Sequence, residues 1–292
     1  MCATRQEAQS AIEYGRVFVS GTLADKSARM VAAAEAISVA SAESTYVSRG
    51  GHKLSSALDR FGIDAHGLWV LDAGASTGGF SDCMLQRGVA HVYAVDVGYG
   101  QLHPKVRHDA RVSVFERTNI KNLLLPENVG GSLPFDPVDM VTADLSFISL
   151  RSVLSLLLGP ILKEKGDLVL LVKPQFEAGR MEVSRGKGVI RDPDIWHRVL
   201  LEVVSKLEDL DSAIVDMMPS PLIGPAGNVE FLFHAKKGED KFGRERVLCL
   251  VDETVGEAVE RQSSIKIKEQ PHPCKQASDS AVDLGQEAGT WP

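Results

Sequence analysis

Apolar residues recur along most of this chain with two spacings, one typical of strands and one typical of helices. Short apolar runs predict strands at residues 69–73, 89–95, 112–116, 140–143, 167–172 and 229–235. Apolar positions three or four residues apart predict helices at residues 53–61, 81–87, 153–162 and 195–207. Strands that alternate with helices form parallel sheets with helices on both faces. We therefore expect an α/β fold with a doubly wound, mostly parallel sheet over residues 53–240.

The two ends of the chain have patterns of their own. Residues 1–41 contain a helical stretch at 5–14 that stops at Gly15, followed by two strand candidates at 16–22 and 36–39. About 40 residues bury little core, so we expect a small α+β module that depends on the rest of the chain. Small residues and a glycine pair predict a linker at 42–52. Residues 241–261 predict a C-terminal helix, and the polar composition of 262–292 predicts a disordered tail.

Composition narrows the class of protein. A hydrophobic content of 44% in 292 residues excludes wholesale disorder. No apolar run approaches the roughly 18–20 residues of a membrane span, and no secretory signal is recognisable, so we expect a cytoplasmic protein that does not bind membranes. The four cysteines lack metal-ligand spacing, which predicts free thiols and no metal site. A net charge of −7 argues against a generic nucleic-acid binder, so any RNA contact must come from a local patch.

A glycine-rich loop follows the first strand of the predicted sheet, in the order Asp72-Ala-Gly74-Ala-Ser-Thr-Gly78-Gly79-Phe80. Glycines let the backbone approach a ligand closely, and the following helix presents free N–H groups. Asp96 ends the next strand, about 20 positions on, where ribose hydroxyls are expected. The layout suits dinucleotides and S-adenosylmethionine alike, but the loop is not G-x-G-x-x-G and an aspartate precedes it, which favours the methyl donor. The predicted cofactor residues are Asp72, Gly74, Ser76, Thr77, Gly78, Gly79, Phe80, Asp96, Asn119 and Asp144.

Charged residues end two further strands. Asp144 follows the strand at 140–143, and Lys173 follows the apolar run that ends at Val172. For either residue alone, a solvated loop charge is an adequate explanation. The carboxyl ends of parallel strands meet at one ligand crevice, however, and a lysine after an apolar run is costly without a partner or a task. Their joint placement therefore predicts that both lie near the transferred methyl group.

Five motifs together resemble one family. They are Ser48-Arg-Gly-Gly-His-Lys53, the loop from Asp72 to Phe80, Thr142-Ala-Asp144-Leu-Ser-Phe-Ile-Ser, Leu171-Val-Lys173-Pro-Gln-Phe-Glu-Ala-Gly and Gly227-Asn-Val-Glu230-Phe. In this order they resemble the TlyA (hemolysin A-type) rRNA methyltransferases. Those proteins join an S4 RNA-binding domain to an FtsJ/RrmJ-like methyltransferase domain of the Rossmann-like class I type. The resemblance implies 2′-O-methylation of cytidines in small- and large-subunit rRNA, with S-adenosylmethionine as the cofactor.

The resemblance also implies a catalytic tetrad of Lys53, Asp144, Lys173 and Glu230. A ribose 2′-hydroxyl is a poor acid, so its reaction requires a base and a cation that holds the developing alkoxide. Lys173 is the best candidate for the base if its surroundings lower its pKa toward neutrality. Asp144 would orient Lys173, and Glu230 would position the ribose or Lys53. In-line attack makes positioning important, and no metal is required.

Basic residues predict where RNA would bind. Residues 179–191 combine four basic residues with glycines that allow movement, which predicts a phosphate-binding lid, although a solvated loop is the alternative. In residues 1–41 the resemblance is to the second helix and the strand of an S4 domain, and the expected first helix is absent before Met1, so we expect a partial S4-like module. The predicted RNA-binding residues are Arg5, Arg16, Arg49, Arg180, Arg185, Lys187 and Arg191.

Other functions stay open on the residues alone. A methyltransferase for a small molecule or a protein would not need the tetrad. A nicotinamide dehydrogenase is disfavoured by the spacing of the glycine loop. The alternative outside enzymology is a non-catalytic RNA- or ribosome-binding protein that retains the methyltransferase fold. Ribosomal RNA or ribosomal subunits are the expected partners, and the sequence does not indicate the oligomeric state.

Overall fold

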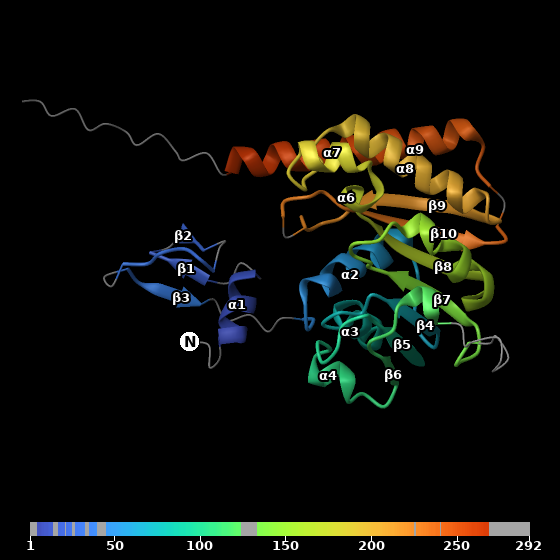
Figure 1. Cartoon of the computed structure of the whole chain (residues 1–292), viewed down its shortest axis with the longest axis horizontal. Helices are drawn as coiled ribbons and strands as arrows, with labels where there is room; N and C mark the ends of the chain where they lie inside the picture. The colour runs from blue at the N-terminus through green and yellow to red at the C-terminus, as the bar shows by residue number, and fades with distance from the viewer. Residues whose placement is uncertain are drawn as a thin grey trace, which may run out of the picture.

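The computed structural model describes residues 5–13, 17–20, 22–24, 27–32, 35–39, 45–123, 133–224, 226–239 and 241–268. Its largest element is a seven-stranded sheet in the order β6-β5-β4-β7-β8-β10-β9. The first five strands in that order are parallel, and β10 runs antiparallel to both of its neighbours. The expected α/β fold with a mostly parallel sheet is confirmed (Figure 1). The strands are β4 (Trp69–Ala73), β5 (His91–Val95), β6 (Val112–Phe115), β7 (Val138–Ala143), β8 (Leu162–Val172), β9 (Ser212–Pro219) and β10 (Phe231–Lys237).

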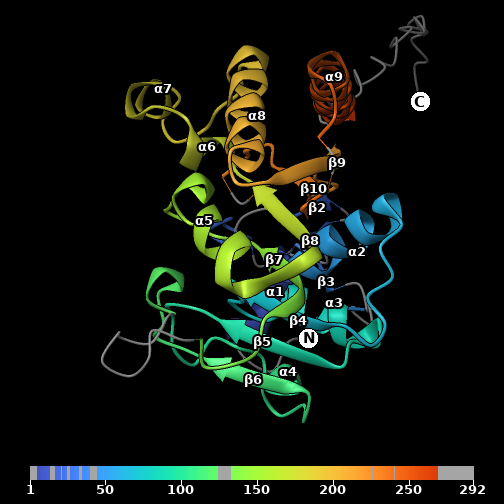
Figure 2. The same ribbon diagram turned by 90° about the vertical axis from the view of Figure 1, so that its right-hand side faces the viewer.

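Helices cover both faces of this sheet because its central strands are apolar on both sides. Along β8, Leu168, Leu170 and Val172 belong to one buried cluster, whereas Val169 and Leu171 belong to another. The first cluster includes α5 (Leu154–Leu156), α8 (Pro193–Glu208) and α9 (Arg244–Lys268), and the second includes α2 (Arg49–Phe61) and α3 (Gly79–Gln86). Figure 2 shows α2 and α3 on one side of the strands and α5 on the other. This arrangement leaves the carboxyl edge of the parallel strands to the connecting loops.

Two elements differ from the expected pattern. The helix predicted at residues 153–162 is two short helical turns, α5 and η4 (Leu157–Ile161), preceded by η3 (Leu150–Ser152). Pro160 has no N–H to donate within η4, and β8 begins at Leu162. Strand β9 was not predicted, since Asp216 and Pro219 interrupt its apolar run. It pairs with β10 and packs under α8 and α9, which buries most of its side chains.

The predicted linker over 42–52 is wrong in its last four residues. Helix α2 begins at Arg49, and the glycine pair lies inside its first turn. A Cβ on Gly51 would lie 2.4 Å from the Cβ of Tyr46, and a Cβ on Gly50 would lie 3.4 Å from the Phe80 ring. Gly50 therefore permits close packing of α2 against Phe80 of α3, and Gly51 permits close packing against Tyr46, which a sequence pattern alone does not distinguish from flexibility.

The N-terminal module contains a short helix and a small sheet. Helix α1 (Arg5–Glu13) precedes β1 (Val17–Val19), which pairs antiparallel with β2 (Thr22–Leu23) and with β3 (Ile37–Val39). Among its described residues, the core consists of Ala11, Val17, Val19 and Ala24, with Ile12 and Val39 packed against them. The module thus has the predicted helix and strands, and its likeness to a partial S4 domain stays a prediction.

The C-terminal helix is longer than predicted. Helix α9 runs from Arg244 to Lys268, so the boundary expected at Gln262 lies inside the helix. Val247, Leu250, Val251 and Val255 anchor its first half in the core, and the polar part continues the same backbone hydrogen bonds. The remainder of the predicted tail, from residue 269 onward, lies outside the described residues.

Candidate active site

The glycine-rich loop lies directly against the end of the neighbouring strand. Gly74, Ser76 and Gly78 have positive φ angles of 85°, 49° and 91°, as a tight turn from β4 into α3 requires. A Cβ on Gly74 would lie 2.5 Å from the backbone oxygen of Asp144. The close approach predicted for this loop therefore involves β7 as well as any ligand.

Asp96 lies under the loop at the end of β5. Its Oδ2 accepts a hydrogen bond of 2.8 Å from the Ser76 N–H, and its Oδ1 accepts one of 2.6 Å from the Gly98 N–H. Both loops are thus tied to one carboxylate, 20 residues along the chain from Ser76. Asp96 shapes the rim of the crevice in which ribose hydroxyls were expected.

A cleft of about 540 Å³ opens at this edge of the sheet. Asn119 lines it, and the Asn119 side chain also accepts a hydrogen bond of 3.0 Å from the Lys121 N–H, which caps η1 (Ile120–Asn122). Predicted cofactor residues make up part of the lining, which includes Gly74, Ser76, Asp96, Gly98, Gln101, Thr118, Asn119, Asp144 and Phe147. A hollow of similar volume, about 560 Å³, lies between α8 and α9 and contains no residue predicted for the site.

Asp72 lies beneath the cleft and does not line it. Its side chain is fully buried, and its carboxylate accepts hydrogen bonds of 2.6 Å from Ser81 Oγ and 3.1 Å from Thr142 Oγ1. Burial raises the pKa of the Asp72 carboxyl from 3.8 to about 6, and the two hydroxyl donors oppose that rise. Asp72 therefore links β4, α3 and β7 behind the loop, where it can shape the cleft without touching a ligand.

The remaining loop residues bring two helix N-termini together. A Cβ on Gly79 would lie 2.1 Å from Ser48 Oγ and 2.9 Å from the Gly51 nitrogen, so only glycine fits between α3 and α2. Thr77, Gly79 and the buried Phe80 line a smaller hollow of about 110 Å³ together with Lys53 and Asp144. Asp144 lines this hollow and the larger cleft, so the two adjoin at its side chain.

Lys53 and Glu230 form the first of two lysine–carboxylate pairs. Lys53 on α2 places its Nζ 2.5 Å from Glu230 Oε2, and both side chains are buried, with 10% and 3% of their surface exposed. Glu230 directly precedes β10, and a Cβ on Gly224 would lie 2.7 Å from Glu230 Oε1. The pair thus joins the helix before the glycine loop to the far half of the sheet.

Lys173 and Asp144 form the second pair. Lys173 Nζ lies 2.5 Å from Asp144 Oδ1 and donates a hydrogen bond of 2.9 Å to Ser146 Oγ. Asp144 Oδ1 is buried and accepts no well-directed hydrogen bond within the described residues, so the contact with Lys173 is an ion pair. The structure therefore brings together the two strand-end residues that the sequence predicted to meet.

The predicted RNA-binding residues are scattered. Arg180 and Arg185 begin and end α7 (Arg180–Arg185), so the expected mobile lid is in part a helix. These two residues, Lys187 and Arg191 are exposed. Arg49 instead donates a hydrogen bond of 2.7 Å to the Ile223 carbonyl, which gives it a structural contact. Arg5 is exposed on α1, and Arg16 lies outside the described residues.

Several residues at the site were not singled out by the sequence. Asn228 is buried, and its side chain accepts from the Ile190 N–H at 2.9 Å and donates to the Gly188 carbonyl at 3.0 Å. Phe147 has a positive φ of 63° and is 92% exposed beside the cleft. Glu177 is buried at the end of α6 (Pro174–Glu177) and accepts hydrogen bonds from Ser149 Oγ and from the Leu150 N–H. Asn228, Phe147 and Glu177 all lie inside the quoted motifs, which was the available signal.

The described residues contain neither a cluster of metal ligands nor a helix that could span a membrane. No three or more histidine, cysteine or acidic side chains in this part of the chain are placed to hold one metal ion. None of the helices within the described ranges is both long enough and apolar enough to cross a membrane.

Comparison with known proteins adds a family to this geometry. Residues 46–237 match the model of the family described as FtsJ-like methyltransferases. The 16S/23S rRNA (cytidine-2′-O)-methyltransferase TlyA of Mycobacterium tuberculosis is 46% identical over 242 residues, which cover 82% of this chain and 87% of that protein. Hemolysin A of Brachyspira hyodysenteriae is 39% identical over 234 residues, which cover 79% of this chain and 93% of that protein.

A solved structure supports the same relationship. A hemolysin-type protein from Streptococcus thermophilus superposes with a TM-score of 0.69 at 34% identity, covering 90% of this chain and 94% of its own. These matches confirm the resemblance that the five motifs indicated.

Proposed function

This chain belongs to the family of FtsJ-like methyltransferases, and from that premise we propose that it methylates ribose 2′-hydroxyls of ribosomal RNA, at cytidines of the small and large subunits. One observation carries the proposal. Two lysine–carboxylate pairs, Lys53–Glu230 and Lys173–Asp144, each contribute one residue, Lys53 and Asp144, to the lining of a hollow that adjoins the predicted cofactor cleft. The name of the Mycobacterium tuberculosis relative supports the choice of rRNA and cytidine.

S-adenosylmethionine is the methyl donor of this family, and the residues of the cleft fit it. The positive φ of Gly74 and its close approach to the Asp144 backbone set the path of the loop along one wall of the cleft. Asp96 offers acceptors at the position expected for ribose hydroxyls, and Asn119 and Gly98 offer polar groups beside it. When bound, S-adenosylmethionine supplies a methyl group carried on a positively charged sulfur. Gly74, Asp96, Gly98 and Asn119 are the residues that would hold it.

The two pairs have different roles in the activation of a weakly acidic hydroxyl. Lys173 is the cation of the pair with Asp144, so it must first release a proton to solvent. The free amine then accepts the proton of the 2′-hydroxyl as the oxygen bonds to the methyl group, and Asp144 Oδ1 at 2.5 Å stabilises the ammonium that forms again. Lys53, in its ion pair with Glu230, stabilises negative charge that develops on the ribose oxygen. Ser146, which accepts from Lys173 at 2.9 Å, limits the orientations of the amine.

RNA would reach this site along exposed basic residues beyond Lys173. Arg180 and Arg185 on α7, with Lys187 and Arg191 after it, present four cations that phosphates can contact. Asn228, which lies two residues before Glu230 in the chain, holds the end of this segment by hydrogen bonds to Gly188 and Ile190. Because the proposed substrate is ribosomal RNA, we infer that the protein works in the cytoplasm.

Methyl transfer to defined RNA tests this function. The protein is incubated with labelled S-adenosylmethionine and with bare rRNA, small subunits or large subunits that lack the modification. We expect label in at least one rRNA, and the three substrates separate free RNA from assembled subunits. Label in none of them would overturn the proposed substrate.

A further inference from the structure

Glu177 joins the two loops that leave the predicted catalytic strand ends. It is the last residue of α6 (Pro174–Glu177), whose N-cap is Lys173. Its carboxylate accepts hydrogen bonds of 2.5 Å from Ser149 Oγ and 2.6 Å from the Leu150 N–H, in the loop that begins at Asp144. The side chain is 1% exposed. A buried hydrogen bond thus bridges the two loops. Glu177 lies four residues after Lys173, and its partner Ser149 lies five residues after Asp144.

Strand pairing does not reach Lys173, so something else must hold it. The last paired residues of β7 and β8 are Ala143 and Leu170, and pairing of β8 with β10 ends at Val172. Asp144 and Ser146 hold the Lys173 amine, and beyond the strand pairs the path of the Lys173 backbone depends on α6. The Glu177 bridge fixes that path relative to the loop after Asp144.

Arg151 completes the bridge. Its Nε lies 3.2 Å from Glu177 Oε2, and one of its terminal nitrogens donates a hydrogen bond of 2.7 Å to the Glu177 carbonyl. The buried carboxylate therefore has a cation and two neutral donors, which offsets the cost of removing its charge from water. The same guanidinium donates at 2.6 Å to Glu202 on α8.

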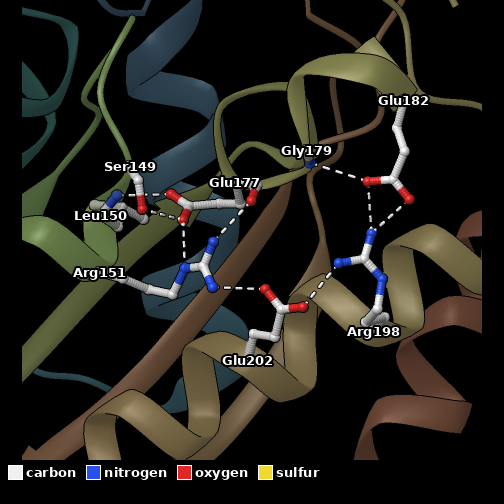
Figure 3. Close-up of polar contacts among 8 residues, drawn as sticks. All are labelled: Ser149, Leu150, Arg151, Glu177, Gly179, Glu182, Arg198 and Glu202. Atoms are coloured by element: carbon white, nitrogen blue, oxygen red, sulfur yellow. Dashed lines mark hydrogen bonds and ion pairs between the residues drawn. The ribbon is translucent and has the colours of Figure 1, made fainter. Parts of the chain in front are cut away.

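The charges continue as an alternating ladder toward the surface, shown in Figure 3. Glu202 accepts from Arg198 at 2.8 Å, and Arg198 contacts both carboxylate oxygens of Glu182 at 2.7 Å. Glu182 on α7 in turn accepts from the Gly179 N–H at 2.9 Å. The ladder links the basic helix α7 to the bridge at Glu177 through α8.

We propose that Glu177 is a positioning residue for methyl transfer, which holds Lys173 and Asp144 in the geometry that the reaction needs. The inference rests on the proposed function of those two residues. Glu177 contacts neither of them, so it acts through α6 and the loop at 149–151. Loss of the bridge should lower the rate of the chemical step and leave binding of both substrates nearly unchanged, since a small misplacement of reacting groups costs rate.

Glu177→Gln tests this role with the full chain. The glutamine keeps the shape but loses the charge and one acceptor. We expect the first-order rate constant for methyl transfer, at saturating S-adenosylmethionine and rRNA, to fall about 10- to 100-fold. The Kd for S-adenosylmethionine and the RNA concentration at half-maximal rate should each change less than about two-fold. Asp167→Asn is the control, because Asp167 is a carboxylate within β8 that lies 2.7 Å from His234 Nε2 and 3.8 Å from Lys236 Nζ, away from the site.

The outcomes separate the possibilities. An unchanged rate constant in Glu177→Gln, or a loss shared equally by cofactor affinity and rate, overturns the positioning role while wild-type activity keeps the proposed function. Absence of methylation by the wild-type protein overturns the proposed function itself. If Glu177→Gln does not fold, Ser149→Ala removes a single hydrogen bond of the bridge. That variant should lose about two- to five-fold in the same rate constant, and no loss would overturn the proposal.

Discussion

Lys53 and Glu230 stand 177 positions apart in the chain, and their side chains meet in a buried ion pair of 2.5 Å. The pair connects α2, which packs beside the glycine loop, to the start of β10 on the other side of the catalytic strands. A buried pair of this kind contributes little net stability when compared with apolar residues, but breaking it is costly. We therefore interpret the presence of this buried ion pair as a requirement of the reaction.

Lys53→Met leaves Glu230 buried without its cation, and we expect it to lower the free energy of unfolding by about 3–5 kcal/mol. The double variant Lys53→Met with Glu230→Met replaces both charges, so it should recover most of that stability while methylation stays lost. Denaturant titrations and a methylation assay on the three proteins check this. Recovery of activity together with stability would contradict a catalytic role of the pair.

Lys173→Ala removes the proposed base. The rate of methyl transfer should fall about 10²- to 10⁴-fold. The Kd for S-adenosylmethionine should stay close to that of the wild type, because Lys173 does not line the cofactor cleft. Lys163→Ala is the control, since Lys163 lies on the same strand and forms an ion pair of 2.7 Å with Asp139 away from the site. Retained turnover in Lys173→Ala would remove the base assignment.

Asp96→Asn should weaken cofactor binding. The carboxylate accepts from two backbone N–H groups, Ser76 and Gly98, whereas an amide presents one acceptor and turns its NH₂ group toward the other donor. We expect the Kd for S-adenosylmethionine, measured by calorimetry, to rise about ten-fold or more. Asp252→Asn, at an exposed carboxylate on α9, should leave that Kd unchanged. Equal affinities of the two variants would count against the predicted site.

Asp72 should make stability depend on pH. Burial raises the pKa of its carboxyl to about 6 in the folded protein, against 3.8 for the ordinary group. The folded state therefore holds this proton more tightly than the unfolded state. The stability contributed by the protonated Asp72 carboxyl is fully present below pH 3.8 and is lost as the pH rises through about 6. Relative to Asp72→Asn, which does not titrate, the wild type should lose about 2–3 kcal/mol between pH 4 and pH 7. A difference that does not vary with pH would contradict the raised pKa.

The sequence predicted where the strand-end residues lie because a local pattern, an apolar run followed by a charged residue, marks the carboxyl end of a parallel strand. An apolar run followed by Asp144 or Lys173 places each residue at the carboxyl edge, and adjacent strands bring them together. The position of Asp96 directly after β5 was predicted in the same way. The meeting of Lys53 with Glu230 depends on how α2 docks on the sheet, which no local pattern encodes, and only the family resemblance indicated it.

Other features could not be predicted for physical reasons. The glycine pair at 50–51 resembles a flexible linker in the sequence, yet it permits packing on Tyr46 and Phe80 within a helix. Strand β9 carries Asp216 and Pro219, which hide its apolar pattern. The role of Glu177 requires the folded path of α6, since its partners lie 26 to 28 residues earlier in the chain.

The position of the transferred methyl group tests the central claim most directly. Ribosomal RNA that lacks the modification is incubated with the protein and S-adenosylmethionine, then digested to nucleosides and analysed by mass spectrometry. We predict 2′-O-methylcytidine with the wild-type protein and none above background with Lys173→Ala. A methyl group on a base, or no methylated nucleoside with the wild type, would contradict the account.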